Sequence, residues 1–413
     1  MKYGLIGKTL KHSFSKDIHE RLGYEYSLKE LAPEELDTFF KKKDFSAINV
    51  TIPYKEAVIK YLDEIDPAVL QIGACNTIVN KNGRLFGYNT DFSGAKALIL
   101  RQNIPIQGKK ALILGTGGTS KTYYHVLKSL GAAKIKKVSR TPANEEISYD
   151  EAYSRCSDAE IIINTTPVGM FPNTDASPID PSRFPQLSLV VDAIYNPLRT
   201  ELVLKARQHS VKSSGGLYML VSQAVFASEL FEKVKAEEKT ITNIYHTLLK
   251  EKRNTVFIGM PGVGKSTIAR LIGGNYIDTD KEIEKKYLMS PKDIILKYGE
   301  KNFREKESTV IKSLSDINGV AIATGGGVPL SEENIKNLKK NGIVIYLDAP
   351  LERLTATEGR PLSKNPELLK KLYIQRKDVY AAACDISVSA AGSIDDTLKN
   401  VKETLENYEN TCY

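Results

Sequence analysis

The chain of 413 residues is poor in cysteine, and its apolar residues form no long run. Its four cysteines lie far apart, without a Cys-x-x-Cys pair or metal-site spacing, and are expected to be free thiols in a reducing compartment. No apolar run approaches the ~18 residues of a membrane-spanning helix, and no secretory signal is visible. These absences argue against the secreted and membrane classes and predict a cytoplasmic protein.

Basic residues are not gathered into a stripe either, although the formal net charge is +8. The lysines are scattered, aromatic residues do not interleave with them, and no helix-turn-helix is evident, so no nucleic-acid partner is expected. A mild positive balance suits small anionic substrates and phosphates instead. The length predicts two or three domains, and the oligomeric state is not indicated.

One glycine-rich stretch has a specific meaning. Gly259-Met-Pro-Gly262-Val-Gly264-Lys265-Ser266-Thr267 has the P-loop spacing, after an apolar stretch at 255–258 and before a predicted helix at 266–272. In such a turn the backbone N–H groups face phosphate oxygens at the positive end of the helix. Lys265 is expected to reach the β- and γ-phosphates of ATP, and Ser266 to ligate Mg²⁺. A glycine turn met by chance is the alternative.

A second glycine turn lies earlier, between a predicted strand at 109–114 and a helix that ends near Leu130. It reads Gly115-Thr-Gly117-Gly118-Thr119-Ser120, a variant of the dinucleotide fingerprint, and a strand at 134–139 completes a βαβ unit. Where NAD-binding folds usually place an acid, the chain has Ser139-Arg140-Thr141. An arginine there can pair with a 2′-phosphate and stack on adenine, which favours NADP over NAD. A surface arginine is the alternative.

Short apolar strands alternate with helical stretches along the chain, which is the α/β pattern. A helix is predicted at 54–62, and a hairpin about Asn82-Gly83. The charged segment 232–252 is expected to complete a helix before a domain boundary near Arg253. Ligands are expected beyond the carboxyl ends of the strands.

Several ungapped motifs in residues 1 to about 250 resemble shikimate dehydrogenase. They are His12-Ser13-Phe-Ser15, Asn49-Val-Thr51-Ile-Pro-Tyr-Lys55, Gly73-Ala-Cys-Asn76-Thr, Gly87-Tyr-Asn-Thr-Asp91 and Gly216-Leu-Tyr-Met-Leu-Val-Ser-Gln223. The resemblance implies that Lys55 is the acid/base of ketone reduction and that Asp91 orients it. It also implies substrate-hydroxyl contacts from Asn76 and Gln223, and a nicotinamide close to three residues, Gly216, Met219 and Tyr195.

The residue types support part of this assignment. Asn49 and Thr51 are two apart on a predicted strand, so they point to one face and can fix ring hydroxyls. Ser13 and Ser15 offer hydroxyl donors for a carboxylate. A solvated side chain is the alternative for Lys55.

The chain departs from the family pattern at two positions. Asn144 stands where a second arginine is usual, so the preference for NADP is expected to be weaker. Lys16 stands where proline is usual, which alters the entry to a helix and no obvious contact.

Residues 254 to about 408 resemble shikimate kinase. Beyond the P-loop they contain Asp278-Thr-Asp280, Phe303-Arg304-Glu305, Gly325-Gly326-Gly327, Arg360-Pro-Leu and Gln-Arg376-Lys. Asp278 can hold Mg²⁺ through water while Asp280 accepts from the attacking hydroxyl. Arg304 and Arg376 suit bidentate capture of a carboxylate. The glycines let backbone N–H groups, Gly326 and Gly327 among them, approach the substrate.

The resemblance further implies a mobile lid at 357–365, with Arg360 reaching the transferring phosphate, and Arg353 stacked on adenine. The predicted fold is therefore an N-terminal α/β substrate domain (1–100 and 215–250) with a Rossmann-like NADP domain (101–214), followed by a P-loop kinase domain with a parallel sheet (254–413). Together the two resemblances imply NADPH-dependent reduction of 3-dehydroshikimate and ATP-dependent phosphorylation of shikimate, in aromatic amino-acid biosynthesis. An NAD-using quinate/shikimate dehydrogenase fused to the kinase, or a non-catalytic metabolite-sensing regulator, are the alternatives.

Overall fold

The computed structural model describes residues 1–10, 14–237, 239–354 and 365–412. The chain divides into two compact units, Met1–Thr247 and Leu248–Tyr413, and helix α9 (Thr240–Lys252) runs across the division. The expected boundary near Arg253 lies at the end of α9. The finer subdivision of the first part, into 1–100 with 215–250 and 101–214, stays a prediction.

The first unit contains a mixed sheet built from its N-terminal segments. Its strand order is β2 (Ser27–Glu30), β1 (Tyr3–Gly7), β3 (Ala47–Val50), β5 (Thr77–Lys81), β6 (Arg84–Tyr88) and β4 (Glu64–Ile65). Three short helices accompany it, α1 (Ser15–Arg21), α2 (Leu36–Lys42) and α3 (Pro67–Ile72). β5 and β6 form the predicted hairpin, and Asn82 and Gly83 both have positive φ, as a tight hairpin turn requires.

A parallel sheet follows in the same unit. Its order is β11 (Lys212–Ser214), β10 (Leu189–Asp192), β9 (Ile161–Asn164), β7 (Lys110–Leu114) and β8 (Lys134–Val138), with helices α5 (Gly118–Ser129), α6 (Tyr149–Arg155) and α7 (Glu201–Gln208) in its connections. The central strands are continuous apolar runs that are fully buried, as expected where helices cover both faces.

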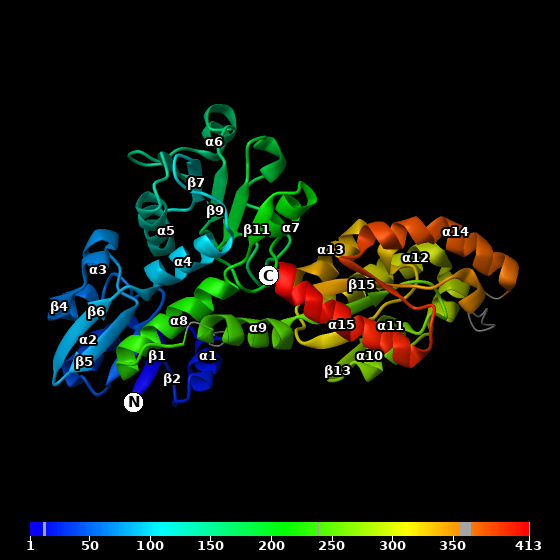
Figure 1. Ribbon diagram of the computed structural model, residues 1–413, viewed down its shortest axis with the longest axis horizontal. Helices are drawn as coiled ribbons and strands as arrows, with labels where there is room; N and C mark the ends of the chain where they lie inside the picture. Colours follow the sequence, from blue (N-terminus) through cyan, green and yellow to red (C-terminus); the bar gives the residue numbers. More distant parts are fainter. Residues whose placement is uncertain (11–13, 238, 355–364, 413) are drawn as a thin grey trace. The chain divides into compact units, whose positions relative to one another are not determined.

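Helices α4 (Thr90–Arg101) and α8 (Leu217–Glu232) lie between these two sheets (Figure 1). The two helices approach closely at Gly94, where a Cβ would lie 2.8 Å from the Met219 carbonyl oxygen and 3.0 Å from the Gln223 Cβ. The absence of a side chain at Gly94 therefore fixes how near α8 lies to α4.

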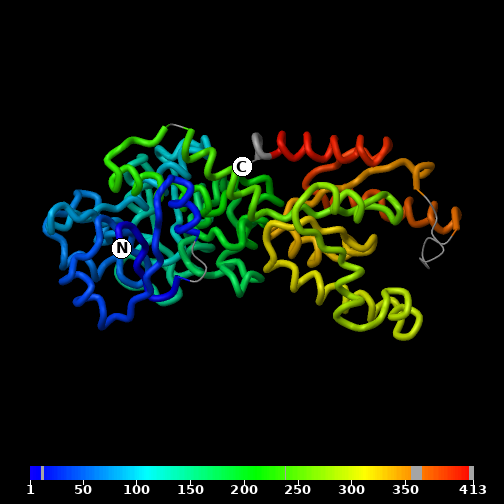
Figure 2. The backbone as a smooth tube through the Cα atoms, turned by 90° about the horizontal axis from the view of Figure 1, so that it is seen from below, coloured from blue at the N-terminus to red at the C-terminus, as the bar shows by residue number. Residues whose placement is uncertain are grey.

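The second unit is a parallel sheet covered on both faces. Its order is β13 (Asn275–Asp278), β14 (Val320–Ala323), β12 (Asn254–Ile258), β15 (Gly342–Asp348) and β16 (Ile386–Ser389). Its helices are α10 (Lys265–Leu271), α11 (Thr279–Tyr287), α12 (Pro291–Leu314), α13 (Glu332–Asn341), α14 (Pro366–Ala383) and α15 (Ile394–Cys412). In Figure 1 α10 and α15 lie on one side of β15, with α13 and α14 on the other. Figure 2 shows α15, in red, along the outside of this unit.

Short 3-10 turns complete the description, at Pro33–Glu35, Ile59–Tyr61, Pro181–Arg183, Val328–Leu330 and Leu351–Arg353. Within the described ranges no helix is both long and apolar enough to cross a membrane. The α/β class and its sheets agree with the prediction from the sequence.

Two helix predictions were wrong. Residues 54–62 form turns and a single 3-10 turn, because the Lys55 carbonyl accepts from the Cys75 amide at 2.8 Å instead of continuing a helical ladder. The segment 232–252 is not one continuation of α8, since Lys233 has a left-handed conformation (φ 56°) that ends the helix before α9 begins.

Candidate active sites

A cavity of about 350 Å³ in the first unit brings together residues from both sheets. The N-terminal sheet with its loops, α1 and α4 supply one wall, and α5, α8 and the loops after β10 and β11 supply the other. The predicted residues in its lining are Ser15, Asn49, Thr51, Lys55, Asn76, Asp91, Thr119, Tyr195, Gly216, Met219 and Gln223.

Lys55 and Asp91 meet inside this cavity. The Lys55 Nζ lies 2.6 Å from the Asp91 Oδ2, and both side chains are mostly buried. Asp91 is in the first turn of α4, which begins sharply because the Asn89 side chain accepts from the Phe92 amide. A carboxylate held this close fixes the position of the Lys55 Nζ, so Lys55 can deliver a proton to an oxygen in the cavity.

Asn49 and Asn76 belong to a buried hydrogen-bond network. The Asn49 Oδ1 accepts from the Tyr26 hydroxyl at 2.7 Å, and its Nδ2 donates to the Thr77 Oγ1 at 3.0 Å. The Asn76 Oδ1 accepts from the Thr90 amide at 2.7 Å. The network holds both amide groups in one orientation at the wall of the cavity.

Behind Asn49 stands a fully buried imidazole. His19 stacks on Tyr26 with ring centroids 4.0 Å apart, and its Nδ1 lies 2.5 Å from the Tyr24 hydroxyl. Burial lowers the pKa of His19 to about 3, because the charged imidazolium would lose its hydration. The neutral ring therefore fixes Tyr26, which fixes Asn49. The sequence did not predict the roles of His19 and Tyr26, since no local pattern shows that residues 19, 26 and 49 meet.

The glycine turn at 115–120 has the conformation that a phosphate-binding loop needs. Gly115 has φ 102°, and α5 starts at Gly118 without a side-chain cap among the described residues. By contrast α6 is capped by the Ser148 hydroxyl. The first amides of α5 are thus left for an anion such as the cofactor's pyrophosphate.

Arg140 follows β8 and is exposed at the rim of this turn. Burial raises the pKa of Tyr149, and the positive charge of Arg140 opposes that shift. The Ser139 Oγ accepts from the Thr141 amide at 3.3 Å and shapes the turn. Asn144, which stands where the family pattern has a second arginine, has φ 54°, a left-handed conformation that asparagine tolerates well.

The opposite wall of the cavity is supplied by β10, α8 and the loops beside them. Tyr195 contacts Phe14 with ring centroids 5.3 Å apart, and the Met219 Sδ accepts from the Tyr123 hydroxyl at 3.2 Å. A Cβ on Gly216 would lie 2.2 Å from the Ala193 carbonyl oxygen, so glycine is required there. The Gln223 Nε2 donates to the Leu220 carbonyl at 2.9 Å.

In the second unit the P-loop has the predicted geometry. Gly259, Gly262 and Gly264 have φ values of 143°, 85° and 99°. The Lys265 Nζ donates to the carbonyl oxygens of Gly259 and Met260, at 2.9 and 3.0 Å. These two bonds hold the ammonium over the loop in which phosphates bind.

Ser266 and Asp278 face each other at the end of the loop. The Ser266 Oγ donates to the Asp278 Oδ2 at 2.6 Å, and the Asp278 Oδ1 accepts from the Asp280 amide at 3.1 Å. A hydroxyl and a carboxylate beside a phosphate loop are oxygen donors of the kind that Mg²⁺ prefers, together with water and phosphate. The residues present therefore fit that ion.

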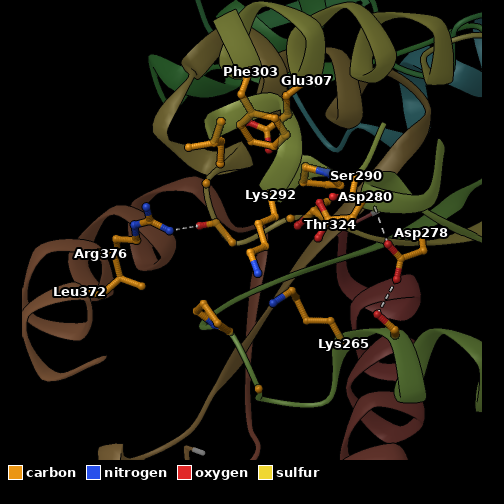
Figure 3. Close-up of a pocket in the computed structure, with 18 of the residues that line it drawn as sticks. Lys265, Asp278, Asp280, Ser290, Lys292, Phe303, Glu307, Thr324, Leu372 and Arg376 are labelled. Carbon is orange, nitrogen blue, oxygen red and sulfur yellow. Dashed lines mark hydrogen bonds between the residues drawn. The ribbon is translucent and has the colours of Figure 1, made fainter. Parts of the chain in front are cut away.

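A cavity of about 620 Å³ opens above the P-loop (Figure 3). It is lined by most of the predicted kinase residues: Gly262, Gly264, Lys265, Ser266, Thr267, Asp278, Asp280, Arg304, Gly326, Gly327 and Arg376. The strand ends of β13 and β14 supply the acidic and glycine segments, and α12 and α14 supply the arginines.

The two arginines pack against the glycine loop. The Arg376 Nη1 donates to the Gly326 carbonyl at 2.9 Å, which also accepts from the Tyr380 hydroxyl at 2.7 Å. A Cβ on Gly327 would lie 2.0 Å from the Arg304 Nη1. The Arg304 guanidinium can therefore pack against the glycine loop only because residue 327 has no side chain.

Glu307 was not identified from the sequence, although it orients Arg304. It is buried, its Oε2 lies 2.8 Å from the Arg304 Nη1, and burial raises its pKa. Its position three residues after Arg304 on a helix was the available signal. Lys292, also unpredicted, lines the same cavity.

Among the predicted residues that the structure describes, those that do not line the two cavities are Gly115, Gly117, Gly118, Ser120, Ser139, Arg140, Thr141, Gly259 and Arg353. Ser13, Arg360 and most of the lid at 357–365 lie outside the described residues, while Asn365 caps α14. Arg353 is exposed, and its guanidinium donates to the Gly392 carbonyl. Its stacking on adenine stays a prediction.

By fold and site, the first unit is a Rossmann-type oxidoreductase and the second is a P-loop phosphotransferase. Residues 5–78 match the family model of the shikimate dehydrogenase substrate binding domain, and residues 261–406 match that of shikimate kinase. The NADP(+)-dependent shikimate dehydrogenase of Clostridium beijerinckii is 35% identical over 259 residues, which are 59% of this chain and 96% of that protein.

Solved structures agree. Shikimate dehydrogenase 1 from Peptoclostridium difficile matches with a TM-score of 0.55 at 36% identity, over 60% of this chain and 98% of that one. The shikimate 5-dehydrogenase of Thermus thermophilus, solved with NADP(H) and shikimate, matches with a TM-score of 0.54 at 29% identity, over 60% and 99%. The chain therefore belongs to the shikimate dehydrogenase family, and it also carries a shikimate kinase domain.

Proposed function

We propose that the chain catalyses two consecutive steps of the shikimate pathway. The first unit reduces 3-dehydroshikimate to shikimate with NADPH, and the second phosphorylates the 3-hydroxyl of shikimate with ATP. The observation that carries this proposal is that each of two cavities combines a nucleotide-binding turn with groups suited to one carboxylated, hydroxylated ring.

In the reduction, Lys55 is the proton donor. NADPH, when bound, supplies the hydride to the carbonyl carbon. The Lys55 ammonium gives its proton to the carbonyl oxygen as that oxygen gains charge, and Asp91 holds the ammonium in line. Asn49, Asn76 and the other polar side chains of that wall fix the ring, so that one face is presented to the nicotinamide side.

In the phosphorylation, Asp280 accepts the proton of the 3-hydroxyl while Lys265 balances charge on the transferring group. Arg304 and Arg376 hold the substrate carboxylate at the glycine loop. Mg²⁺, held by Ser266 and through water by Asp278, neutralises phosphate charge when it is bound. The P-loop amides and the uncapped start of α10 cradle the phosphates.

Arg140 supports NADPH as the reductant, because it can pair with a 2′-phosphate from the rim of the first glycine turn. The absence of an acid at that strand end removes the usual partner of the NAD ribose.

One assay tests both steps. The intact chain is supplied with 3-dehydroshikimate, NADPH and ATP-Mg, while NADPH absorbance and the mass of the products are followed. Loss of NADPH with accumulation of shikimate 3-phosphate is expected. Faster turnover with NADH would contradict the cofactor assignment, and ligand binding without turnover in both units would contradict catalysis.

A further inference from the structure

Lys292 is a cation that the proposed kinase chemistry has not yet used. It is the second residue of α12, and it lines the 620 Å³ cavity together with Ser290, Pro291 and Ile295. Its side chain is exposed, and no ion pair or hydrogen bond joins it to another of the described residues. The neighbouring carboxylate of Asp293 is engaged instead by the Ser290 hydroxyl, at 2.7 Å.

The direction of the side chain is informative. In Figure 3 the Lys292 amine descends from α12 into the cavity, and Lys265 points toward it from the P-loop on the opposite wall. Two ammonium groups that face one space repel each other, and an anion between them removes that repulsion. Lys265 already marks the phosphate position, so the anion expected there is a phosphoryl group.

The substrate carboxylate has other partners. Arg304 and Arg376 lie against Gly327 and Gly326, at the glycine-loop end of the cavity. Three carboxylates line the cavity, and none forms an ion pair with Lys292 among the described residues: Asp278 is bonded to Ser266, Glu307 is bonded to Arg304, and Asp280 is the proposed proton acceptor. The Lys292 ammonium is therefore available to bind a phosphoryl group on the P-loop side of the cavity.

We propose that Lys292 contacts the phosphoryl group in transit, as the γ-phosphate of ATP and then as the 3-phosphate of the product. During transfer the bond from the γ-phosphorus to its bridging oxygen breaks, a bond to the 3-oxygen forms, and the hydroxyl proton passes to Asp280. Lys292 exchanges no proton in this step and donates hydrogen bonds to equatorial oxygens. This inference rests on the proposed kinase function.

The test compares Lys292→Gln with Lys297→Gln in the intact chain. Lys297 is exposed on the same helix and does not line the cavity, so it controls for loss of one charge. Binding of shikimate and of shikimate 3-phosphate is measured by calorimetry, and the phosphorylation rate with saturating ATP-Mg is measured alongside. Reduction of 3-dehydroshikimate by the same preparations reports correct folding of the first unit.

Lys292→Gln is expected to weaken binding of shikimate 3-phosphate by about tenfold, and to lower kcat similarly, while shikimate affinity changes by less than about twofold. Lys292→Arg is expected to restore both, and Lys297→Gln to change neither. Equal loss for both ligands would overturn the proposal, because Lys292 would then touch the ring or carboxylate. Unchanged product binding and kcat would also overturn it. If the unaltered chain bound neither shikimate nor shikimate 3-phosphate, that result would contradict the proposed kinase function itself.

Discussion

Lys55 can donate a proton because its partner is close and the water around it is limited. The Lys55→Ala change removes the donor, so reduction of 3-dehydroshikimate is expected to slow by about 10²–10⁴-fold, whereas phosphorylation of shikimate is unchanged. NADPH oxidation and ATP-dependent product formation are measured separately on the same preparation.

The matched control for this change is Lys60→Ala, since Lys60 is exposed and pairs with Asp37 outside the cavity. Reduction should continue at the normal rate in that variant. If the Lys55→Ala protein reduced 3-dehydroshikimate at a rate within threefold of the unaltered chain, Lys55 would not be the proton donor.

His19 makes the stability of the first unit depend on pH. Its pKa is lowered from 6.5 to about 3 in the folded protein, so the unfolded chain binds a proton below pH 6.5 that the folded chain refuses. The contribution of His19 to the free energy of unfolding is full above pH 6.5, and it is expected to fall by about 1.4 kcal/mol for each pH unit between 6.5 and about 3. Urea unfolding at several pH values, with hydrogen exchange of α1 peptides to assign the transition, measures the slope.

The His19→Phe variant keeps a stacking ring without a titrating group, so its slope should be smaller by this amount. His209→Phe, at an exposed histidine, is the control and should keep the normal slope. Identical slopes in all three proteins would show that the neutral imidazole is not held as described.

Among the elements, the turn after β8 is expected to set the choice of cofactor. The Arg140→Gln change removes the pairing with a 2′-phosphate, so KM for NADPH is expected to rise by about tenfold or more, while KM for NADH is almost unchanged. Initial rates with both cofactors measure the ratio. Arg155→Gln, an exposed arginine of α6 paired with Glu151, is the control. A parallel rise for both cofactors would mean that Arg140 supports the fold of the turn rather than the phosphate.

The elements also show what local patterns can predict. β7, β9 and β10 were predictable because continuous apolar runs between polar turns have few other uses in an α/β protein. The failed helix at 54–62 was not, since its backbone is diverted by an amide of Cys75, distant in sequence. β11 was missed because Lys-Ser-Ser has no strand-like pattern and pairs only through β10.

The candidate sites follow the same division. The glycine turns, the Lys55–Asp91 pair and the two arginines were identified because motif spacing fixes them. Glu307, Lys292 and Tyr26 were not, because they matter only through side chains brought to them by the folded sheet.

In the chain as a whole, the two chemistries use separate cavities, so they should fail separately. Chelating Mg²⁺ with EDTA is expected to abolish phosphorylation and to leave NADPH oxidation unchanged, because Ser266 and Asp278 belong to the second unit alone. Lys265→Ala should have the same selective effect. Both activities are followed in one cuvette. Excess Mg²⁺ should restore phosphorylation in the EDTA-treated sample but not in the Lys265→Ala variant. Loss of reduction on chelation would contradict the separation.

The close approach at Gly94 has a consequence for altering specificity. Met219 and Gln223 lie one turn apart on α8, and Gly94 of α4 abuts both. Sliding α8 outward to admit a bulkier ring would also move Met219, which is predicted to lie beside the nicotinamide, and would lengthen the path of the hydride. Substitutions that admit a larger acceptor must therefore be sought on the facing wall, at Asn49 and Thr51, which belong to β3 and the loop after it and not to α4 or α8.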